Sequence, residues 1–226
     1  MTVASIDRVV GSRDALLEAL DAAPSVDLSF LREVPADGGS ASAPDLLRLL
    51  HALVSTLQPR HVLEFGSGVS TAVLAHAATE LGNCAVTSVD HDPQLVAATS
   101  ELIGADGPVS LQHAPLVARV HGGHLGPSYL VDSSLFASPR PADLVLVDGP
   151  PEVLGGRATM LPVALDYAQC GSIVLFPDGD HALGPWEQVL GAAVEVHRPA
   201  GFARGLAAVI LVAPRTAQIR LTPKRS

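Results

Sequence analysis

The sequence is poor in cysteine, in aromatic residues and in charge, and each shortage narrows what it encodes. Its two cysteines, Cys84 and Cys170, form no metal-type spacing, and we interpret them as free thiols of a cytoplasmic protein. Aromatic residues make up only 4% of the chain, which leaves few stacking surfaces for single-stranded nucleic acid. No apolar run approaches the roughly 18–20 residues of a membrane span, and the N-terminal stretch has no signal-peptide core. We therefore expect neither membrane insertion nor export.

Basic residues are also scarce, with 14 against 23 acidic ones and a net charge of −9. This balance argues against a nucleic-acid partner, because phosphate backbones are bound through clustered lysines and arginines. The single basic cluster lies in residues 215–226, which we interpret as a solvated tail: Arg215, Arg220, Lys224 and Arg225. Since 48% of the 226 residues are hydrophobic, the rest of the chain has enough apolar side chains for one large core.

The most informative stretch reads HVLEFGSGVST, from His61 to Thr71. It predicts a buried strand that ends at Phe65, a tight glycine turn, and a helix that continues to Leu81. Such a turn brings unpaired backbone N–H groups and a helix N-terminus to one point. That point suits a polar or anionic part of a small ligand.

A second apolar strand, from Val86 to Asp90, ends on a carboxylate 22 residues after Gly68. In an alternating strand–helix fold, this spacing places the acid within reach of a ribose that is bound at the glycine turn. The two segments together predict a site for a nucleoside-containing ligand.

Strands and helices alternate from His61 onward, which predicts a Rossmann-like α/β three-layer sandwich. The short connection between the last two strands predicts an antiparallel pair at the edge of a mostly parallel seven-stranded sheet. The expected strands span residues 61–65, 85–89, 109–113, 142–148, 172–176, 193–197 and 206–212. The expected helices span residues 12–20 with Ser12 as N-cap, 44–57, 71–81, 93–103 and 158–168. We expect residues 1–60 to form a helical cap and residues 61–214 the ligand-binding domain.

Three features together resemble the class I S-adenosylmethionine-dependent methyltransferases over about residues 43–212. They are the Glu-x-Gly-x-Gly turn, the acid that ends the second strand, and the final antiparallel pair. Within that superfamily, LEFGSGVST and VLVDGPP are similar to the small-molecule O-methyltransferase-like branch.

The resemblance implies that S-adenosylmethionine is the cofactor, and it assigns residues to the two ends of that molecule. The methionine side would be lined by Glu64, Gly66, Ser67 and Gly68. Ser70, at the helix start, would hydrogen-bond the methionine carboxylate.

At the nucleoside end, the resemblance implies that Asp90 accepts both ribose hydroxyls and that His91 flanks the adenine. His113 and Ala114, after the third strand, would also contact the adenine. Asp148 would end the fourth strand beside the sulfonium, where a carboxylate can face the positive charge or hold a metal.

A nicotinamide-dependent oxidoreductase is the main rival because its fingerprint also combines glycines with a distal acid. Here Thr71 stands where that fingerprint has its third glycine, and Glu64 would repel a pyrophosphate. We therefore favour a methyltransferase. A second alternative is a protein that binds the cofactor but does not catalyse methyl transfer.

Two routes for removing a proton from the acceptor are visible. In the metal route, Asp148, Asp178 and Asp180 bind Mg²⁺ or another divalent cation, which lowers the pKa of a bound hydroxyl. Related metal-dependent enzymes carry two adjacent ligands after the fifth strand, whereas Gly179 separates the two aspartates here.

In the metal-free route, His181 is the general base because it closely follows Asp180 in the loop after the fifth strand, with His121 and His124 as second choices. Asp178 is a further candidate catalytic residue. Arg157 is expected to be solvated, although a contact with an acidic group is the alternative. Tyr129 and Trp186 would line the acceptor pocket or belong to the core.

The sequence contains no motif that identifies the methyl acceptor. Its pocket is expected between the N-terminal helices, residues 115–141 and residues 177–185. We favour a hydroxyl oxygen of a small molecule, with nitrogen as the alternative, and the helical cap is a candidate surface for a homodimer.

Overall fold

The computed structural model describes residues 2–31, 42–104, 107–121, 124–131, 141–177 and 191–213, together with residues 179, 183 and 186. Its strands are β1 (His61–Phe65), β2 (Ala85–Asp90), β3 (Val109–His113), β4 (Leu116–His121), β5 (His124–Tyr129), β6 (Ala142–Val147), β7 (Ala168–Pro177), β8 (Val194–His197) and β9 (Leu206–Leu211). Its α-helices are α1 (Val3–Ala22), α2 (Pro44–Leu57), α3 (Val69–Leu81), α4 (Pro93–Ile103) and α5 (Met160–Asp166). Short 3₁₀ helices are η1 (Ala23–Ser25), η3 (Glu152–Leu154) and η4 (Gly191–Ala193).

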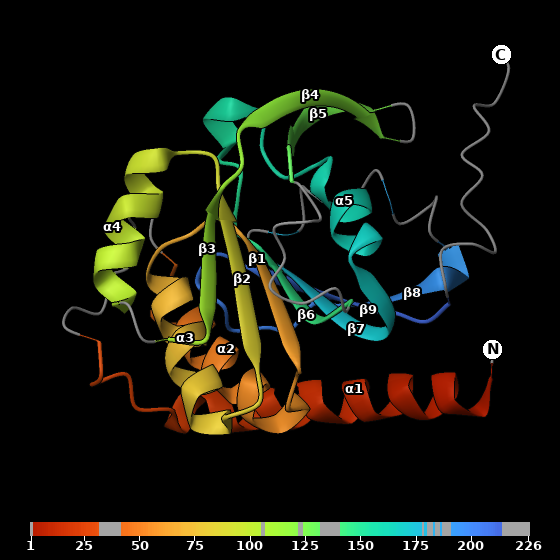
Figure 1. Ribbon diagram of the computed structural model, residues 1–226. Coiled ribbons are helices and arrows are strands. Elements are labelled where there is room, and N and C mark those ends of the chain that lie inside the picture. The colour runs from red at the N-terminus through yellow and green to blue at the C-terminus, as the bar shows by residue number, and fades with distance from the viewer. Residues whose placement is uncertain are drawn as a thin grey trace, which may run out of the picture.

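Seven strands form one sheet in the order β3-β2-β1-β6-β7-β9-β8 (Figure 1). Strands β3, β2, β1, β6 and β7 run parallel to one another, whereas β9 is antiparallel to both β7 and β8. The predicted fold class is therefore confirmed. The strand that comes last in sequence lies inside the sheet, between β7 and β8.

The central strands are almost wholly buried because helices cover both faces of the sheet. On one face, α1, α2 and α3 pack against residues such as Val62, Leu144 and Ile173. On the other face, α5 packs against Leu63, Val145 and neighbouring side chains. The segment predicted as a helical cap thus supplies part of one covering layer.

The first helix is longer than predicted. It begins at Val3 with Thr2 as the N-cap, and Ser12 lies in its middle rather than at its start. The Ser12 hydroxyl donates to the carbonyl oxygens of Arg8 and Gly171. Gly11 in the helix interior is disfavoured by about 1 kcal/mol, but packing of Val9 and Leu16 on the core outweighs that cost.

Strand β7 also begins earlier than predicted, at Ala168 instead of Ser172. Its pairing with β6 shifts register between Ala142 and Leu144, and Gly171 in this stretch has a φ of +87°. We read Gly171 as a boundary, whereas the chain uses it inside the strand. A Cβ there would lie 2.8 Å from the Arg8 side chain, so glycine allows α1 to approach.

Strands β4 and β5 form an antiparallel hairpin that the sequence reading missed. In Figure 1 the hairpin curves over the carboxyl ends of β2 and β3. It occupies part of residues 115–141, which we expect to contribute to the acceptor pocket. Tyr129, at the end of β5, is buried.

The predicted basic tail lies outside the described residues. Within those residues, no helix has the length and apolarity that a membrane span requires. Cys84 and Cys170 are free thiols, as predicted.

Candidate active site

The glycine turn connects β1 to α3 at the carboxyl end of the sheet. Gly66 has a φ of +97°, and its backbone N–H donates to the Val89 carbonyl oxygen at 2.8 Å. A Cβ on Gly66 would lie 2.8 Å from the backbone nitrogen of Gly149. Glycine is required here because the turn after β1 and the loop after β6 touch through their backbones.

Glu64 lies beneath this turn and is fully buried. Three hydroxyls donate to its carboxylate: Ser70 at 2.5 Å, Thr71 at 2.6 Å and Ser88 at 2.6 Å. Burial raises the pKa of Glu64 from 4.5 to about 7, against the opposing effect of these three hydrogen bonds. The charge of Asp148 raises it further. Glu64 thus joins β1, α3 and β2 at the base of the turn.

Asp90 closes the turn from the end of β2. Its Oδ2 accepts the backbone N–H of Ser67 at 2.6 Å, and its Oδ1 accepts the backbone N–H of Asp92 at 2.9 Å. The side chain is only 3% exposed. The Ser67 hydroxyl also lies 3.3 Å from Oδ2. Asp90 therefore holds the glycine turn in place.

The residues predicted to lie near an adenine come together beside Asp90. The His91 Nδ1 lies 3.1 Å from Asp90 Oδ1, and the His113 Nε2 lies 3.1 Å from the carbonyl oxygen of His91. The backbone N–H of Ala114 donates to the Asp90 carbonyl oxygen at 2.7 Å. The ends of β2 and β3 thus form one continuous surface.

Asp148, just after β6, faces two partners that the sequence reading did not assign to it. Its Oδ1 accepts from Arg157 at 2.9 Å, and its Oδ2 accepts from Ser42 at 2.7 Å. Arg157 also donates to the carbonyl oxygen of Pro177 at 2.6 Å, at the end of β7. Its side chain is 14% exposed, so the expected solvated arginine is wrong. Arg157 ties together the ends of two neighbouring strands.

Tyr129 lies at the centre of these groups. Its ring is 5.5 Å from that of Phe65 and 6.3 Å from that of His91, and the residue is 1% exposed. Within the described residues, the Tyr129 hydroxyl has no hydrogen-bond partner. Burial, followed by the charges of Asp90 and Asp148, raises the pKa of this phenol, so it stays neutral. A buried hydroxyl without a partner is costly unless a ligand pairs with it.

A family model described as "Methyltransferase domain" matches residues 63–179, which are 117 of the 226 residues. The chain belongs to this methyltransferase family. Together with the sheet order, this membership confirms the predicted class I S-adenosylmethionine-dependent methyltransferase.

Solved structures with the same fold cover most of the methyltransferase. The S-adenosylhomocysteine-bound methyltransferase PaMTH1 of Podospora anserina is 16% identical, with a TM-score of 0.57 and 88% of each chain covered. Cofactor-bound Rv0187 from MTB is 21% identical, with a TM-score of 0.56 and 89% of each chain covered. An O-methyltransferase from Bacillus cereus in complex with S-adenosylhomocysteine is 13% identical, with a TM-score of 0.54, covering 88% of this chain and 90% of that one. A comparison with curated protein sequences found no match.

The catalytic and metal-binding predictions on the loop after β7 are not tested by this structure. Asp178, Asp180 and His181 lie outside the described residues. Of the second-choice histidines, His121 and His124 pair across the hairpin, and His124 packs edge-on against Trp186 at 5.1 Å.

The described residues of the methyltransferase suit the cofactor, but they do not suit a divalent cation. The glycine turn, the Asp90 carboxylate and the unpartnered Tyr129 hydroxyl suit a nucleoside with a charged amino-acid part. A divalent cation at Asp148 does not fit, because both carboxylate oxygens are bonded and the Arg157 guanidinium is 2.9 Å away. We therefore derive no chemical step through a metal.

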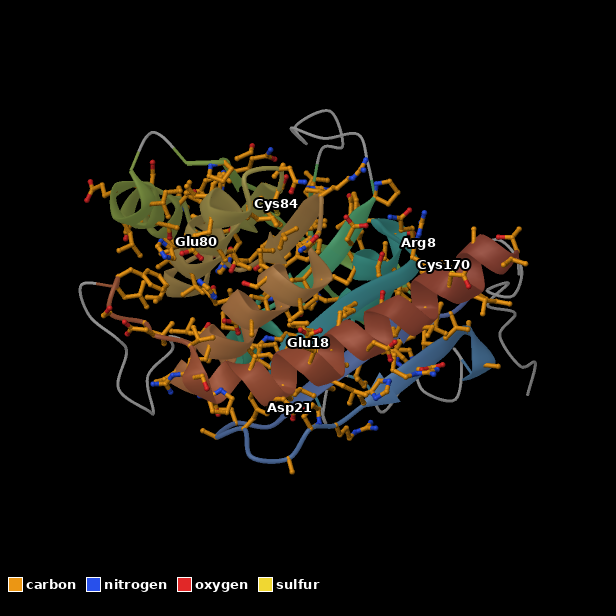
Figure 2. The ribbon with its side chains drawn as sticks, turned by 90° about the horizontal axis from the view of Figure 1, so that it is seen from below. Arg8, Glu18, Asp21, Glu80, Cys84 and Cys170 are labelled. Carbon is orange, nitrogen blue, oxygen red and sulfur yellow. The ribbon has the colours of Figure 1, made fainter. Side chains whose placement is uncertain are left out.

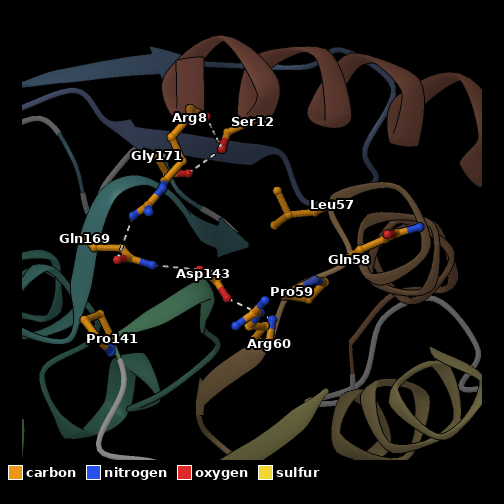
Figure 3. A pocket seen from close by; sticks show the side chains of 10 residues that line it. All are labelled: Arg8, Ser12, Leu57, Gln58, Pro59, Arg60, Pro141, Asp143, Gln169 and Gly171. Atoms are coloured by element: carbon orange, nitrogen blue, oxygen red, sulfur yellow. Dashed lines mark hydrogen bonds between the residues drawn. The ribbon is translucent and has the colours of Figure 1, made fainter. Parts of the chain in front are cut away.

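A hollow of about 570 Å³ lies at the opposite edge of the sheet, before β1, β6 and β7 (Figure 3). Arg8 donates to Gln169, Gln169 donates to Asp143, and Asp143 accepts the backbone N–H of Arg60. These polar groups satisfy one another. Because they surround the amino ends of the parallel strands, the hollow is separate from the glycine turn.

Sequence reasoning missed the Glu64 hydroxyl cluster, the partners of Asp148 and the placement of Tyr129. One signal was available for Tyr129: the pair of glycines between His121 and His124 is typical of a hairpin loop. The contacts of Glu64 with Ser88 and of Asp148 with Ser42 join residues 24 and 106 positions apart and carry no local signal.

Proposed function

We propose that this methyltransferase transfers the methyl group of S-adenosylmethionine to a hydroxyl oxygen of a small molecule. One observation carries the proposal: the glycine turn, Asp90 and Asp148 converge around Tyr129 at the carboxyl edge of the sheet. Ligands of open α/β sheets bind at this edge. The solved O-methyltransferase of Bacillus cereus with the same fold supports an oxygen acceptor.

In this proposal the backbone of Gly66 to Gly68 and the start of α3 hold the methionine part of the cofactor, because helix N-termini favour anions. Asp90 accepts the ribose hydroxyls, and His91 and His113 flank the adenine. Glu64 acts as a positioning residue from beneath the turn, since it is fully buried. Ser70 shares that role because its hydroxyl proton is donated to Glu64.

The cofactor supplies an electrophilic methyl group when it is bound. The residues of the chain must then orient the acceptor and exclude water. The ion pair with Arg157 holds Asp148 in one orientation beside the turn. His181 remains our proposed general base, with Asp178 as a further proposed catalytic residue, because an imidazole can accept a proton near neutral pH.

The proposal extends to the partners. The excess of acidic residues favours a small-molecule acceptor over nucleic acid. The cytoplasmic location and the homodimer through the N-terminal helices also stay predictions.

The decisive experiment measures formation of S-adenosylhomocysteine with panels of small phenols, aliphatic alcohols and amines, with and without EDTA. Turnover with hydroxyl compounds that persists in EDTA supports the proposal. Turnover with amines alone would contradict the oxygen acceptor, and loss of activity in EDTA would contradict the metal-free route. Binding of the cofactor without turnover of any acceptor would instead support the alternative of a cofactor-binding protein.

A further inference from the structure

Three potential metal ligands meet where α2 packs against α3, on the layer that covers one face of the sheet. His76 and Glu80 are one helical turn apart on α3 and therefore share a face of that helix. His51 comes from α2. The ligand atoms of the three side chains all lie within 4.8 Å of one another.

The spacing of these atoms matches a small tetrahedral site. His51 Nε2 lies 3.1 Å from one Glu80 carboxylate oxygen, and His76 Nε2 lies 3.5 Å from the other. Ligands at about 2.0–2.1 Å from a tetrahedral zinc ion are separated by about 3.3 Å. Both histidine–carboxylate separations are close to this value, but they end on different oxygens of Glu80. Side-chain rotation must therefore bring one Glu80 oxygen within reach of both imidazoles for one ion to be bound.

The surroundings restrict the motion of these imidazoles. The Phe30 ring stacks on the His76 ring at 3.8 Å with an interplanar angle of 12°. The His51 side chain is 17% exposed, whereas Glu80, which is labelled in the view from below (Figure 2), is 56% exposed. The site is thus held by packing on one side and open to solvent on the other.

The donor set also selects the kind of ion. Two imidazole nitrogens and one carboxylate suit Zn²⁺ and similar transition metals, whereas Mg²⁺ and Ca²⁺ prefer oxygen ligands. Three protein ligands leave a fourth position for water.

The site is distant from the cofactor. Glu80 lies ten residues after Ser70 on α3, or about 15 Å along the helix axis. We propose that His51, His76 and Glu80 bind a divalent transition-metal ion that cross-links α2 to α3. Such an ion stabilises the packing of the N-terminal helices on the helix that begins at the glycine turn. The proposal is independent of the methyl acceptor.

The test is a calorimetric titration of the full chain with ZnCl₂ at about pH 7.5, after removal of metal with EDTA, because imidazole ligands must be neutral. We expect one equivalent to bind with a micromolar or lower Kd and to raise the Tm, since binding to the folded state alone stabilises it. Mg²⁺ should not compete for this site.

Three variants remove one ligand each: His51→Ala, His76→Ala and Glu80→Gln. Each should weaken Zn²⁺ binding by at least about tenfold. Glu80→Gln is the most informative because the residue is exposed and the amide preserves its shape, so folding is retained. The Tm of each variant in EDTA reports its fold directly.

The matched control is His197→Ala. His197 lies 3.6 Å from Glu195, but among the described residues it belongs to no group of three potential metal ligands. The chain has nine histidines, so this variant measures adventitious binding. Loss of the tight equivalent in the three variants but not in the control supports the proposal. Absence of binding in the wild type, or binding that the three substitutions leave unchanged, would overturn it.

Discussion

Replacing Glu64 by glutamine should change the pH dependence of stability in a defined way. In the folded chain, burial raises the pKa of Glu64 from 4.5 to about 7. Between these two values the unfolded chain loses the proton and the folded chain keeps it, so wild-type stability falls as the pH rises. Glutamine has no charge to desolvate and can pair with the same hydroxyls, because hydroxyls can also accept.

The magnitude follows from the same values. At 1.36 kcal/mol per pKa unit, a rise from 4.5 to about 7 corresponds to about 3 kcal/mol, fully expressed above pH 7 and absent below pH 4.5. The free energy of unfolding of Glu64→Gln minus that of wild type should therefore increase by about 3 kcal/mol between about pH 4.5 and pH 8.

Urea denaturation of both proteins across this pH range measures the difference. Taking the difference between the two proteins cancels the contributions that the other titrating groups make equally to both free energies of unfolding. Glu18→Gln is the control because Glu18 is exposed on α1 (Figure 2) and its charge stays hydrated. A difference between Glu64→Gln and wild type that does not vary with pH would refute the reasoning. It would mean that the three hydroxyls keep the carboxylate ionised in spite of burial.

Three further substitutions test contacts at the candidate site. Gly66→Ala should lower the free energy of unfolding by about 2 kcal/mol or more, because it combines a φ of +97° with a clash at Gly149, and urea denaturation measures the loss. Arg157→Ala should lower it by about 2 kcal/mol in the same assay, since Asp148 is left without its charged partner in a mostly buried position. Tyr129→Phe should leave stability unchanged or raise it by about 1 kcal/mol, while weakening S-adenosylhomocysteine about fivefold in calorimetry.

Each of these substitutions has a matched control. Gly11→Ala lies inside α1 with nothing within 4 Å of the added Cβ and should be slightly stabilising. Arg13→Ala breaks an exposed ion pair with Glu195 and should cost less than about 1 kcal/mol. Tyr167→Phe should not affect the cofactor. If a control substitution changed the free energy of unfolding or the cofactor affinity as much as its test variant, the role assigned to that contact would be contradicted. If Tyr129→Phe left the affinity for S-adenosylhomocysteine unchanged, the Tyr129 hydroxyl would not contact the ligand.

Much of the fold was predictable because its signals are local. Short apolar runs such as Val62–Phe65 lie between glycine and proline residues, and a strand buried on both faces has this pattern. Pro44 and Pro93 begin helices α2 and α4 where the sequence placed them. The start of α1 was missed because Gly11 breaks the pattern locally and only tertiary packing overrides it.

The candidate site was predictable to a lesser degree. Asp90 could be placed because it ends a strand at a fixed distance from the glycine turn. The role of Glu64 could not, since its donors Ser70, Thr71 and Ser88 come from two different elements. The pairing of Arg157 with Asp148 likewise depends on how the connection between β6 and α5 folds back on itself. Long-range contacts of this kind leave no periodicity in the sequence.

The central claim is that the carboxyl edge of the sheet binds S-adenosylmethionine through the glycine turn and Asp90. Calorimetric titration with S-adenosylhomocysteine tests it most directly, with Asp90→Asn as the variant. Asp143→Asn is the control because that carboxylate also accepts a backbone N–H, but at the opposite edge of the sheet. We predict one site per chain that is weakened at least about tenfold in Asp90→Asn, where a charge-assisted hydrogen bond is lost, and unchanged in Asp143→Asn. No binding to the wild type, or equal binding to Asp90→Asn, would contradict the account.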